Sequence, residues 1–404
     1  MRSNPRLRGQ YARLVLSALA LMLVPGATAS AQTALRGAIV QVKVTSAALK
    51  ANLAGESAER EVHIYLPPGY DNGNQRYPAV YLLHGYSLTA QRWIEFTNLA
   101  ATADRAIAAG ARPMILVNPD AYTTHGGSMY SSSPTIGDWE TFIAEDLVAY
   151  VDKNYRTLAQ RDSRGLAGHS MGGYGTLRIG MKRPDVFAAL YPMSSCCVID
   201  ANLTAGAAGG RGAAPAGRAA APGTAPAPGT AAPAAAPAPV PGSAAAAAPS
   251  QTPPQAGRGG RGRGAGAPGD GRGAGRGGFG NVGFGLAAAW APNPKNPPNY
   301  FDLPVVDGQP QPLVIAKFAA NSPFAMLPQY VTNLKKYKAI MLDIGEQDGL
   351  IGQNRQFVEW MQAFGVPHTF ETYQGDHTNK VAERLETKVL PFFAQHLSFT
   401  APRR

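Results

Sequence analysis

The sequence predicts an α/β fold, in which a mainly parallel sheet carries helices on both faces. Strand-like and helix-like segments alternate along the chain, and "RGLAGHS" and "FAALYPMSS" are short apolar runs bounded by glycine or proline. Such runs are typical of strands buried on both faces of a sheet, and their alternation with helices favours a parallel arrangement. The active site of such a sheet lies at the carboxyl ends of its strands.

The individual elements follow from short apolar runs and from the helical spacing of the segments between them. In chain order, the predicted strands are 61–67, 79–85, 114–120, 164–170, 187–195, 339–345 and 368–374. The predicted helices lie at about 91–109, 138–154, 172–182, 326–337, 354–364 and 380–397. The residues just after each strand are therefore the ones to inspect for chemistry.

Residues 1–31 have the order of a secretory signal peptide. Four arginines precede the apolar run "LVLSALALMLV", and "ASA" follows it before Gln32. The run of 11 residues is shorter than the roughly 20 that a membrane-spanning helix needs, which argues against the alternative of a membrane anchor. We expect cleavage after Ala31 and a secreted or periplasmic protein without stable membrane insertion.

Residues 201–290 differ in composition from the rest of the chain. An Ala/Pro-rich part is followed by a Gly/Arg-rich part, and neither has apolar residues at a helical or strand period. Such segments cannot bury enough apolar surface to offset the entropy of ordering them. We therefore predict a disordered insertion at 201–290, which divides one folded domain into a first part at 32–200 and a second part at 291–404.

The formal net charge of +11 is located mainly in these two segments. Without the signal segment and the insertion, the chain is nearly neutral, so the charge says little about a substrate. The Gly/Arg-rich part resembles RNA-binding tracts in composition, but an exported protein meets little RNA. We therefore expect no nucleic-acid partner, and interpret the insertion as a solvated linker or a contact with anionic cell-envelope polymers.

Cys196 and Cys197 are the only cysteines, and they are adjacent. We expect two free thiols, with a strained vicinal bridge or a bond to another chain as the alternatives. No C-x-x-C spacing and no cluster of histidine, cysteine and aspartate with ligand spacing occurs, so no metal or other cofactor is expected.

The stretch "GLAGHSMGGYG", residues 165–175, carries the motif that points to chemistry. Gly168-His169-Ser170-Met171-Gly172 fits G-x-S-x-G, in which a sharp strand-to-helix turn presents a serine hydroxyl above the sheet. The run before the motif is strand-like and the run after it is helix-like, as this turn requires. We therefore predict Ser170 as a nucleophile, near the positive end of the helix that follows.

A serine nucleophile needs a histidine base and a carboxylate that orients the base. His377 stands in the loop between the last predicted strand and the last helix, where such a base is expected. His169 is set aside because we expect the turn to point it elsewhere.

"AIMLDIGEQDGLI" supplies the candidate carboxylates. Asp348 stands in the loop beyond the strand and is the first choice, with Glu346 second, whereas Asp343 falls inside the apolar run. The chain order of serine, acid and histidine is that of α/β-hydrolases and not of the other serine-triad folds.

Stabilisation of an oxyanion needs two backbone N–H groups. One is expected from Met171, the residue after the nucleophile. The other is expected from Tyr86 in "YLLHGYS", where Gly85 allows close approach of the loop. We interpret His84 as a brace of this loop rather than as a base.

With these motifs the chain resembles the esterase family of α/β-hydrolases. This family includes feruloyl and acetyl-xylan esterases, S-formylglutathione hydrolase, enterochelin esterases and the antigen 85 mycolyltransferases. The resemblance rests on "REVHIYLPPGYDNGNQRYPAVYLLHGYSLTAQRW", "GHSMGGYGTLRIGMKRPDVFAALYPMSS", "GEQDGL" and "GDH", and covers about 37–200 and 313–397. It implies Ser170 as nucleophile, Asp348 as acid, His377 as base, and the Tyr86 and Met171 amides as oxyanion hole.

The leading hypothesis is an exported serine carboxylic-ester hydrolase that acts on acyl, feruloyl or acetyl esters of carbohydrates or small alcohols. An acyltransferase of antigen 85 type would use the same triad, and the residues do not separate the two. A non-catalytic envelope-binding protein is a third alternative, which the presence of all three triad residues disfavours. Aromatic residues either line a substrate cleft or pack in the core: Tyr86, Trp93, Tyr130 and Trp139.

Overall fold

The computed structural model describes residues 36–198 and 281–401 of the 404-residue chain. The predicted signal peptide at 1–31 and most of the predicted insertion lie outside the described residues. None of the helices in the described ranges has the length and apolar character needed to span a bilayer.

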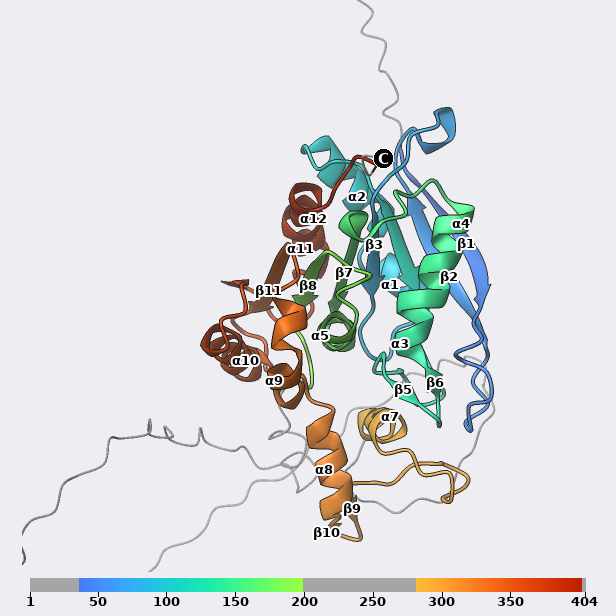
Figure 1. Ribbon diagram of the computed structural model, residues 1–404, viewed down its shortest axis with the longest axis vertical. Coiled ribbons are helices and arrows are strands. Elements are labelled where there is room, and N and C mark those ends of the chain that lie inside the picture. Colours follow the sequence, from blue (N-terminus) through green and yellow to red (C-terminus); the bar gives the residue numbers. More distant parts are fainter. Residues whose placement is uncertain (1–35, 199–280, 402–404) are drawn as a thin grey trace, which may run out of the picture.

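A single large sheet organises the described part of the chain (Figure 1). In spatial order its eight strands are β1 (Ala38–Thr45), β2 (Glu59–Leu66), β4 (Ile115–Pro119), β3 (Ala79–Leu83), β7 (Arg164–His169), β8 (Ala189–Met193), β11 (Ala339–Gly345) and β12 (Thr369–Tyr373). From β4 to β12 all neighbours pair in parallel, whereas β2 pairs antiparallel with β1 and β4. The predicted mainly parallel α/β sheet is confirmed.

β8 and β11 join the two parts of the chain that flank the predicted insertion. Their parallel register pairs Ala189 with Ala339 and Met193 with Asp343. The two parts therefore share one sheet.

β1 is the strand of the large sheet that the predictions missed. Its sequence AIVQVKVT alternates Val40, Val42 and Val44 with Gln41 and Lys43, which is the period of a half-buried strand. The signal was present, but the run is less apolar than those of the inner strands.

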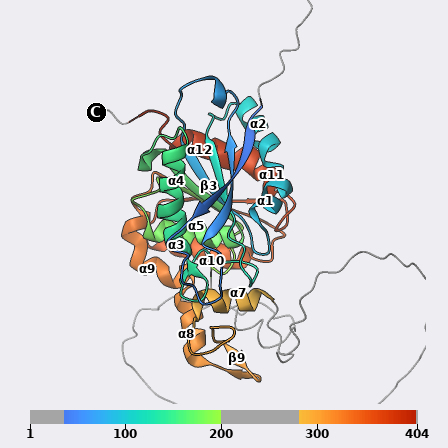
Figure 2. The same ribbon diagram turned by 90° about the vertical axis from the view of Figure 1, so that its right-hand side faces the viewer.

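Helices cover both faces of the sheet, and each face has its own hydrophobic core. One core contains residues of α1 (Ala90–Phe96), α2 (Leu99–Ala108), α11 (Val381–Arg384) and α12 (Leu390–His396). The other contains residues of α3 (Trp139–Thr141), α4 (Leu147–Asn154), α5 (Met171–Lys182), α9 (Pro323–Leu334) and α10 (Ile351–Ala363). Figure 2 shows α1, α2 and α11 on one side of the strands and α3 and α4 on the other.

Two predicted helices are interrupted. The expected helix at 91–109 is divided into α1 and α2, because Asn98 adopts a left-handed φ of 44° between them. The expected helix at 138–154 contains one π-helical turn, Phe142–Asp146, between α3 and α4.

The predicted insertion is too long at its C-terminal end. Residues 281–290 form helix α7 (Asn281–Trp290), which contributes Leu286 and Trp290 to the core. The Trp290 ring packs against Tyr174 and Phe318, with ring centroids 5.3 and 5.5 Å apart. Although this segment follows the Gly/Arg-rich tract, its own sequence ends in the apolar run LAAAW, which can bury surface against the domain.

The segment after α7 contains a short hairpin and a further helix that the predictions also missed. β9 (Val305–Val306) pairs with β10 (Gln309–Pro310), and α8 (Pro312–Ala320) follows. α8 lies beside α7 and leads into α9 (Figure 1). Leu313 on α8 is 81% exposed, so an apolar helix need not be a buried one.

Candidate active site

Ser170 stands at a sharp turn between β7 and α5. Its backbone has φ 58° and ψ −112°. Residues other than glycine rarely adopt this combination, and such conformations are found mostly at functional sites. Its N–H donates to the carbonyl oxygen of Met193 at 3.0 Å, on the neighbouring strand β8. The turn therefore lifts the serine to the carboxyl end of the sheet.

The two glycines of G-x-S-x-G allow this turn because backbone segments approach each other closely there. A Cβ atom on Gly172 would lie 1.9 Å from the carbonyl oxygen of Leu83, at the end of β3. A Cβ atom on Gly168 would lie 2.4 Å from the carbonyl carbon of Gly172. Any side chain at either position would push α5 away from the sheet.

The structure brings Ser170, His377 and Asp348 together. The Ser170 hydroxyl lies 2.9 Å from His377 Nε2, to which it can donate, and His377 Nδ1 lies 2.7 Å from Asp348 Oδ2. Asp348 follows β11 and His377 follows β12, so both approach from the carboxyl edge of the sheet. A hydroxyl placed on the free nitrogen of an oriented imidazole can lose its proton as it attacks.

Asp348 is shielded while His377 is accessible, since their side chains are 1% and 34% exposed. Burial raises the pKa of a carboxyl group, but hydrogen bonds from His377 and from the Leu350 N–H outweigh it, and the pKa of Asp348 stays below its usual value. Asp348 is therefore charged at neutral pH and can hold the Nδ1–H tautomer of His377.

The other two candidate acids have different partners. The exposed Glu346 accepts hydrogen bonds from Gln374 and Thr372. Asp343 is buried and accepts from the Tyr191 hydroxyl and from Arg384 Nε, both at 2.8 Å. Neither carboxylate is hydrogen-bonded to His377.

The side chains of Tyr86 and Met171 both lie next to Gly127. A Cβ atom on Gly127 would lie 2.5 Å from Met171 Sδ and 2.9 Å from Tyr86 Cδ2. A Cβ atom on Gly85 would lie 3.5 Å from Ser170 Cβ, so the loop that carries Tyr86 passes beside the serine. The Met171 N–H belongs to the first turn of α5, where helical amides have no acceptor within the helix.

Hydrogen bonds with the segment after β4 hold the loop at residues 84–90, which we call the oxyanion loop because it carries Tyr86, a predicted oxyanion donor. The Ala121 N–H donates to His84 Nε2 at 2.9 Å, and His84 Nδ1 donates to the carbonyl oxygen of Gly85 at 2.9 Å. The Tyr86 hydroxyl donates to the carbonyl oxygen of His125 at 2.6 Å. His84 is buried and braces the loop, as expected.

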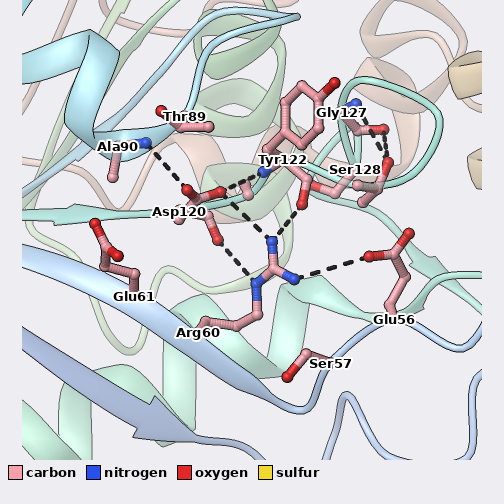
Figure 3. A network of polar contacts seen from close by, with 12 residues as sticks. Glu56, Ser57, Arg60, Glu61, Thr89, Ala90, Asp120, Tyr122, Gly127 and Ser128 are labelled. Atoms are coloured by element: carbon pink, nitrogen blue, oxygen red, sulfur yellow. Dashed lines mark hydrogen bonds and ion pairs between the residues drawn. The ribbon is translucent and has the colours of Figure 1, made fainter. Parts of the chain in front are cut away.

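Arg60 on β2 anchors the segment after β4 from the other side (Figure 3). Its guanidinium donates to the carbonyl oxygens of Asp120 and Tyr122 and pairs with the carboxylates of Asp120 and Glu56. The Asp120 carboxylate in turn accepts from the Ala90 N–H, at the start of α1, at 3.3 Å. The Arg60 side chain thereby links β2 to the segment after β4 and, through Asp120, to the start of α1.

The predictions gave His169 no role at the site. Its Nε2 lies 2.7 Å from the carbonyl oxygen of His377, and the two rings are 4.8 Å apart. The turn directs the His169 ring toward the backbone of His377. Its place next to the serine was the available signal.

The other sequence candidates are resolved by burial. Trp93, Tyr130 and Trp139 are each 0% exposed and pack in the core, whereas Tyr86 is partly exposed. Cys196 and Cys197 are free thiols with sulfur atoms 2.9 Å apart. In residues 36–198 and 281–401, no group of three or more histidine, cysteine, aspartate or glutamate side chains could hold a metal ion.

Comparison with solved structures confirms the α/β-hydrolase fold. A ferulic acid esterase matches with a TM-score of 0.56 and 20% identity, over 90% of this chain and all of that one. An S-formylglutathione hydrolase from Staphylococcus aureus matches with a TM-score of 0.53 and 16% identity, over 89% of this chain and 99% of that one.

Comparison with curated sequences finds shorter but closer matches. An esterase of Mycobacterium tuberculosis is 38% identical over 132 residues, which are 32% of this chain and 27% of that protein. An endo-1,4-beta-xylanase/feruloyl esterase of Xylanibacter ruminicola is 33% identical over 130 residues, which are 31% of this chain and 18% of that protein. The matched region spans about a quarter or less of these relatives.

The family described as "Putative esterase" matches residues 56–381. This range includes Ser170, Asp348 and His377, together with the oxyanion loop, the segment after β4 and Arg60. The chain belongs to this esterase family.

Proposed function

We propose that the protein is a serine carboxylic-ester hydrolase. The observation that carries the proposal is the continuous hydrogen-bonded series from Ser170 through His377 to Asp348, with distances of 2.9 and 2.7 Å. Each member has the residue type and the position that nucleophile, base and orienting acid require. Membership of the esterase family supports the same reaction class.

In the proposed first half of the reaction, Ser170 Oγ attacks the ester carbonyl carbon while His377 Nε2 takes the hydroxyl proton. The carbonyl oxygen becomes an oxyanion, which accepts hydrogen bonds from the Tyr86 and Met171 amides. Removal of one such donor typically costs about 3 to 4 kcal/mol of transition-state stabilisation. When the tetrahedral intermediate collapses, the C–O bond breaks and the alcohol leaves with the proton from His377.

In the second half, water attacks the acyl-serine carbonyl and gives a proton to His377 Nε2. Collapse returns that proton to Ser170 Oγ and releases the carboxylic acid, so the enzyme is regenerated. Asp348 remains ionised throughout and stabilises the imidazolium that forms in each half. Its low pKa suits that role.

We further propose that the protein is exported and that its substrates are acyl, feruloyl or acetyl esters of carbohydrates or small alcohols. Export rests on the signal-like order of residues 1–31. The substrate class rests on the feruloyl esterase names among the relatives and structural neighbours. An exported enzyme would meet plant or envelope polysaccharides rather than cytosolic thioesters.

The test is hydrolysis of p-nitrophenyl acetate, butyrate and octanoate and of methyl ferulate by the mature protein, with Ser170→Ala in parallel. The proposal predicts turnover of at least one ester by the wild type and none above background by the variant. Equal inactivity of both proteins across the series would overturn it. A preference for methyl ferulate would support the aromatic acyl class, and a preference for acetate the small acyl class.

A further inference from the structure

We propose that His169 is a positioning residue that fixes the backbone of the base His377 through a hydrogen bond to its carbonyl oxygen. The inference rests on the proposed function, because it concerns how that site is held. His169 ends β7, directly before Ser170, so a single strand end presents both the nucleophile and the support of the base. The Nε2–O distance is 2.7 Å.

The loop at residues 375–379, which we call the base loop, is shaped largely by its own bonds. Asp376 Oδ1 accepts from the N–H groups of Thr378 and Asn379 at 2.7 and 2.8 Å. These bonds set the local turn but do not fix the loop against the sheet. The Gln347 N–H donates to the carbonyl oxygen of Gly375 at 3.0 Å, which ties the loop to the turn that carries Asp348.

His169 supplies a different connection, between the base loop and the nucleophile strand. The reacting bond from Ser170 to His377 also joins them, but that bond breaks and forms during each turnover. The bond from His169 to the backbone does not take part in proton transfer. It can therefore keep Nε2 of His377 at the same distance from Ser170 through the whole cycle.

His169 is itself held rigidly. It is 4% exposed, and its ring stacks on Trp93 with centroids 6.2 Å apart and planes inclined by 14°. Its Nδ1 lies 3.5 Å from the position that a Cβ on Gly85 would take. Since Trp93 is fully buried, the support runs from the core to the base.

Burial and the neighbouring His377 lower the pKa of His169 to about 4, so His169 is neutral at pH 7. A carbonyl oxygen only accepts, so the proton of neutral His169 lies on Nε2. Neutrality also matters for the reaction, because a charged His169 would repel the imidazolium that forms on His377. The group thus donates a hydrogen bond without adding a charge.

Two variants separate the hydrogen bond from the packing. His169→Phe keeps a ring that stacks on Trp93 but removes the donor. His169→Gln removes the ring but can place an amide N–H near the Nε2 position. Because misplacement of a catalytic group by about 1 Å can lower the rate about 100-fold, we expect His169→Phe to lower kcat by about 10- to 100-fold with KM little changed. We expect His169→Gln to recover most of that loss.

The experiment measures kcat and KM for wild type, both variants and Ser170→Ala, and also hydrogen exchange of the peptide that covers residues 375–379. We expect faster exchange of this peptide in His169→Phe than in wild type, and near-normal exchange in His169→Gln. An unchanged kcat in a folded His169→Phe, or equal losses in both variants, would overturn the inference.

The two proposals fail in different ways. A wild type that hydrolyses no ester refutes the proposed function, and hydrogen exchange then still decides whether His169 holds the base loop. A wild type that depends on Ser170 but is indifferent to His169→Phe refutes the inference alone. Near-wild-type circular dichroism of both variants is the control for folding.

Discussion

The base loop and the oxyanion loop serve one site but are held in different ways. The base loop is partly exposed and is tied to the sheet through a few individual bonds, of which that from His169 to His377 is one. The oxyanion loop is held by several hydrogen bonds at once, one donated by the Ala121 N–H and two accepted by the carbonyl oxygens of His125 and Gly126. The charged cluster around Arg60 supports the same segment (Figure 3).

Because the two loops are held differently, the loss of a single side chain should have different effects on the base side and on the oxyanion side of the site. On the base side each side chain has a distinct task in the proposed reaction, so its loss should reduce activity while the fold remains. On the oxyanion side the contacts are redundant and structural, so the loss of one should lower stability before it lowers activity. Four variant sets test this contrast.

The largest effect is expected from removal of the nucleophile or the base. Ser170→Ala and His377→Ala should each lower kcat on the order of 10⁶-fold, and the double variant should be no worse, because the residues act as one unit. Steady-state kinetics of the three variants on the best ester checks this. Additive losses would show that the two residues act independently.

The next largest effect is expected from removal of the acid. Asp348→Asn keeps the geometry but favours the wrong tautomer of His377, so kcat should fall on the order of 10⁴-fold. The midpoint of thermal unfolding, Tm, should change much less than after replacement of a core residue. Glu346→Gln is the matched control on the same turn, and we expect it to retain activity. If Glu346→Gln were the more damaging change, the assignment of the acid would be wrong.

On the oxyanion side, Arg60→Met should destabilise the protein by about 3 kcal/mol, because it leaves the carboxylates of Asp120 and Glu56 without their cation. The Arg60 side chain is 11% exposed. Arg105→Met, whose side chain is 53% exposed beside Glu386, is the control and should cost less than about 1 kcal/mol. Urea unfolding measures both.

The contrast predicts that Arg60→Met loses less kcat than His169→Phe although it loses more stability. The two variants should be compared at a temperature at which both remain folded. The opposite order would show that the oxyanion loop, and not the base, is the sensitive side of the site.

The smallest effect at neutral pH is expected from the titration of His169, which changes the stability only as the pH falls. The pKa of His169 is about 4 in the folded protein against 6.5 for a free histidine, because burial and the charge of His377 lower it more than Asp348 raises it. Between these values the unfolded chain binds more protons, so the free energy of unfolding decreases as the pH falls from about 6.5 to about 4. This contribution is on the order of 3 kcal/mol.

His169→Gln should therefore show a weaker decrease over that pH range than the wild type. Urea unfolding of both proteins at pH 7 and pH 4.5 gives the comparison. Parallel decreases would mean that His169 is not the group that titrates.

Much of the fold could be predicted because the inner strands are strongly apolar and because glycines mark their ends. β1 was missed since its alternation of valine with Gln41 and Lys43 is a weaker signal than a continuous apolar run. α7 was missed because the Gly/Arg-rich tract before it dominated the composition, while Trp290 finds its partners, Tyr174 and Phe318, only in the folded chain.

Residue type and strand order were enough to select Ser170, Asp348 and His377, whose side chains the structure brings together. The supporting residues could not be predicted in the same way, because their partners are distant in sequence. His169 bonds to a backbone atom 208 residues away, and Arg60 to carbonyls about 60 residues away. Neither contact leaves a pattern in the local sequence.

The most direct test of the central claim is intact-mass and peptide mass spectrometry of the mature protein after brief reaction with p-nitrophenyl acetate or a fluorophosphonate. The account predicts a single acyl or phosphonyl group on Ser170, and none on the Ser170→Ala variant. A group attached elsewhere, or equal labelling of the two proteins, would contradict it.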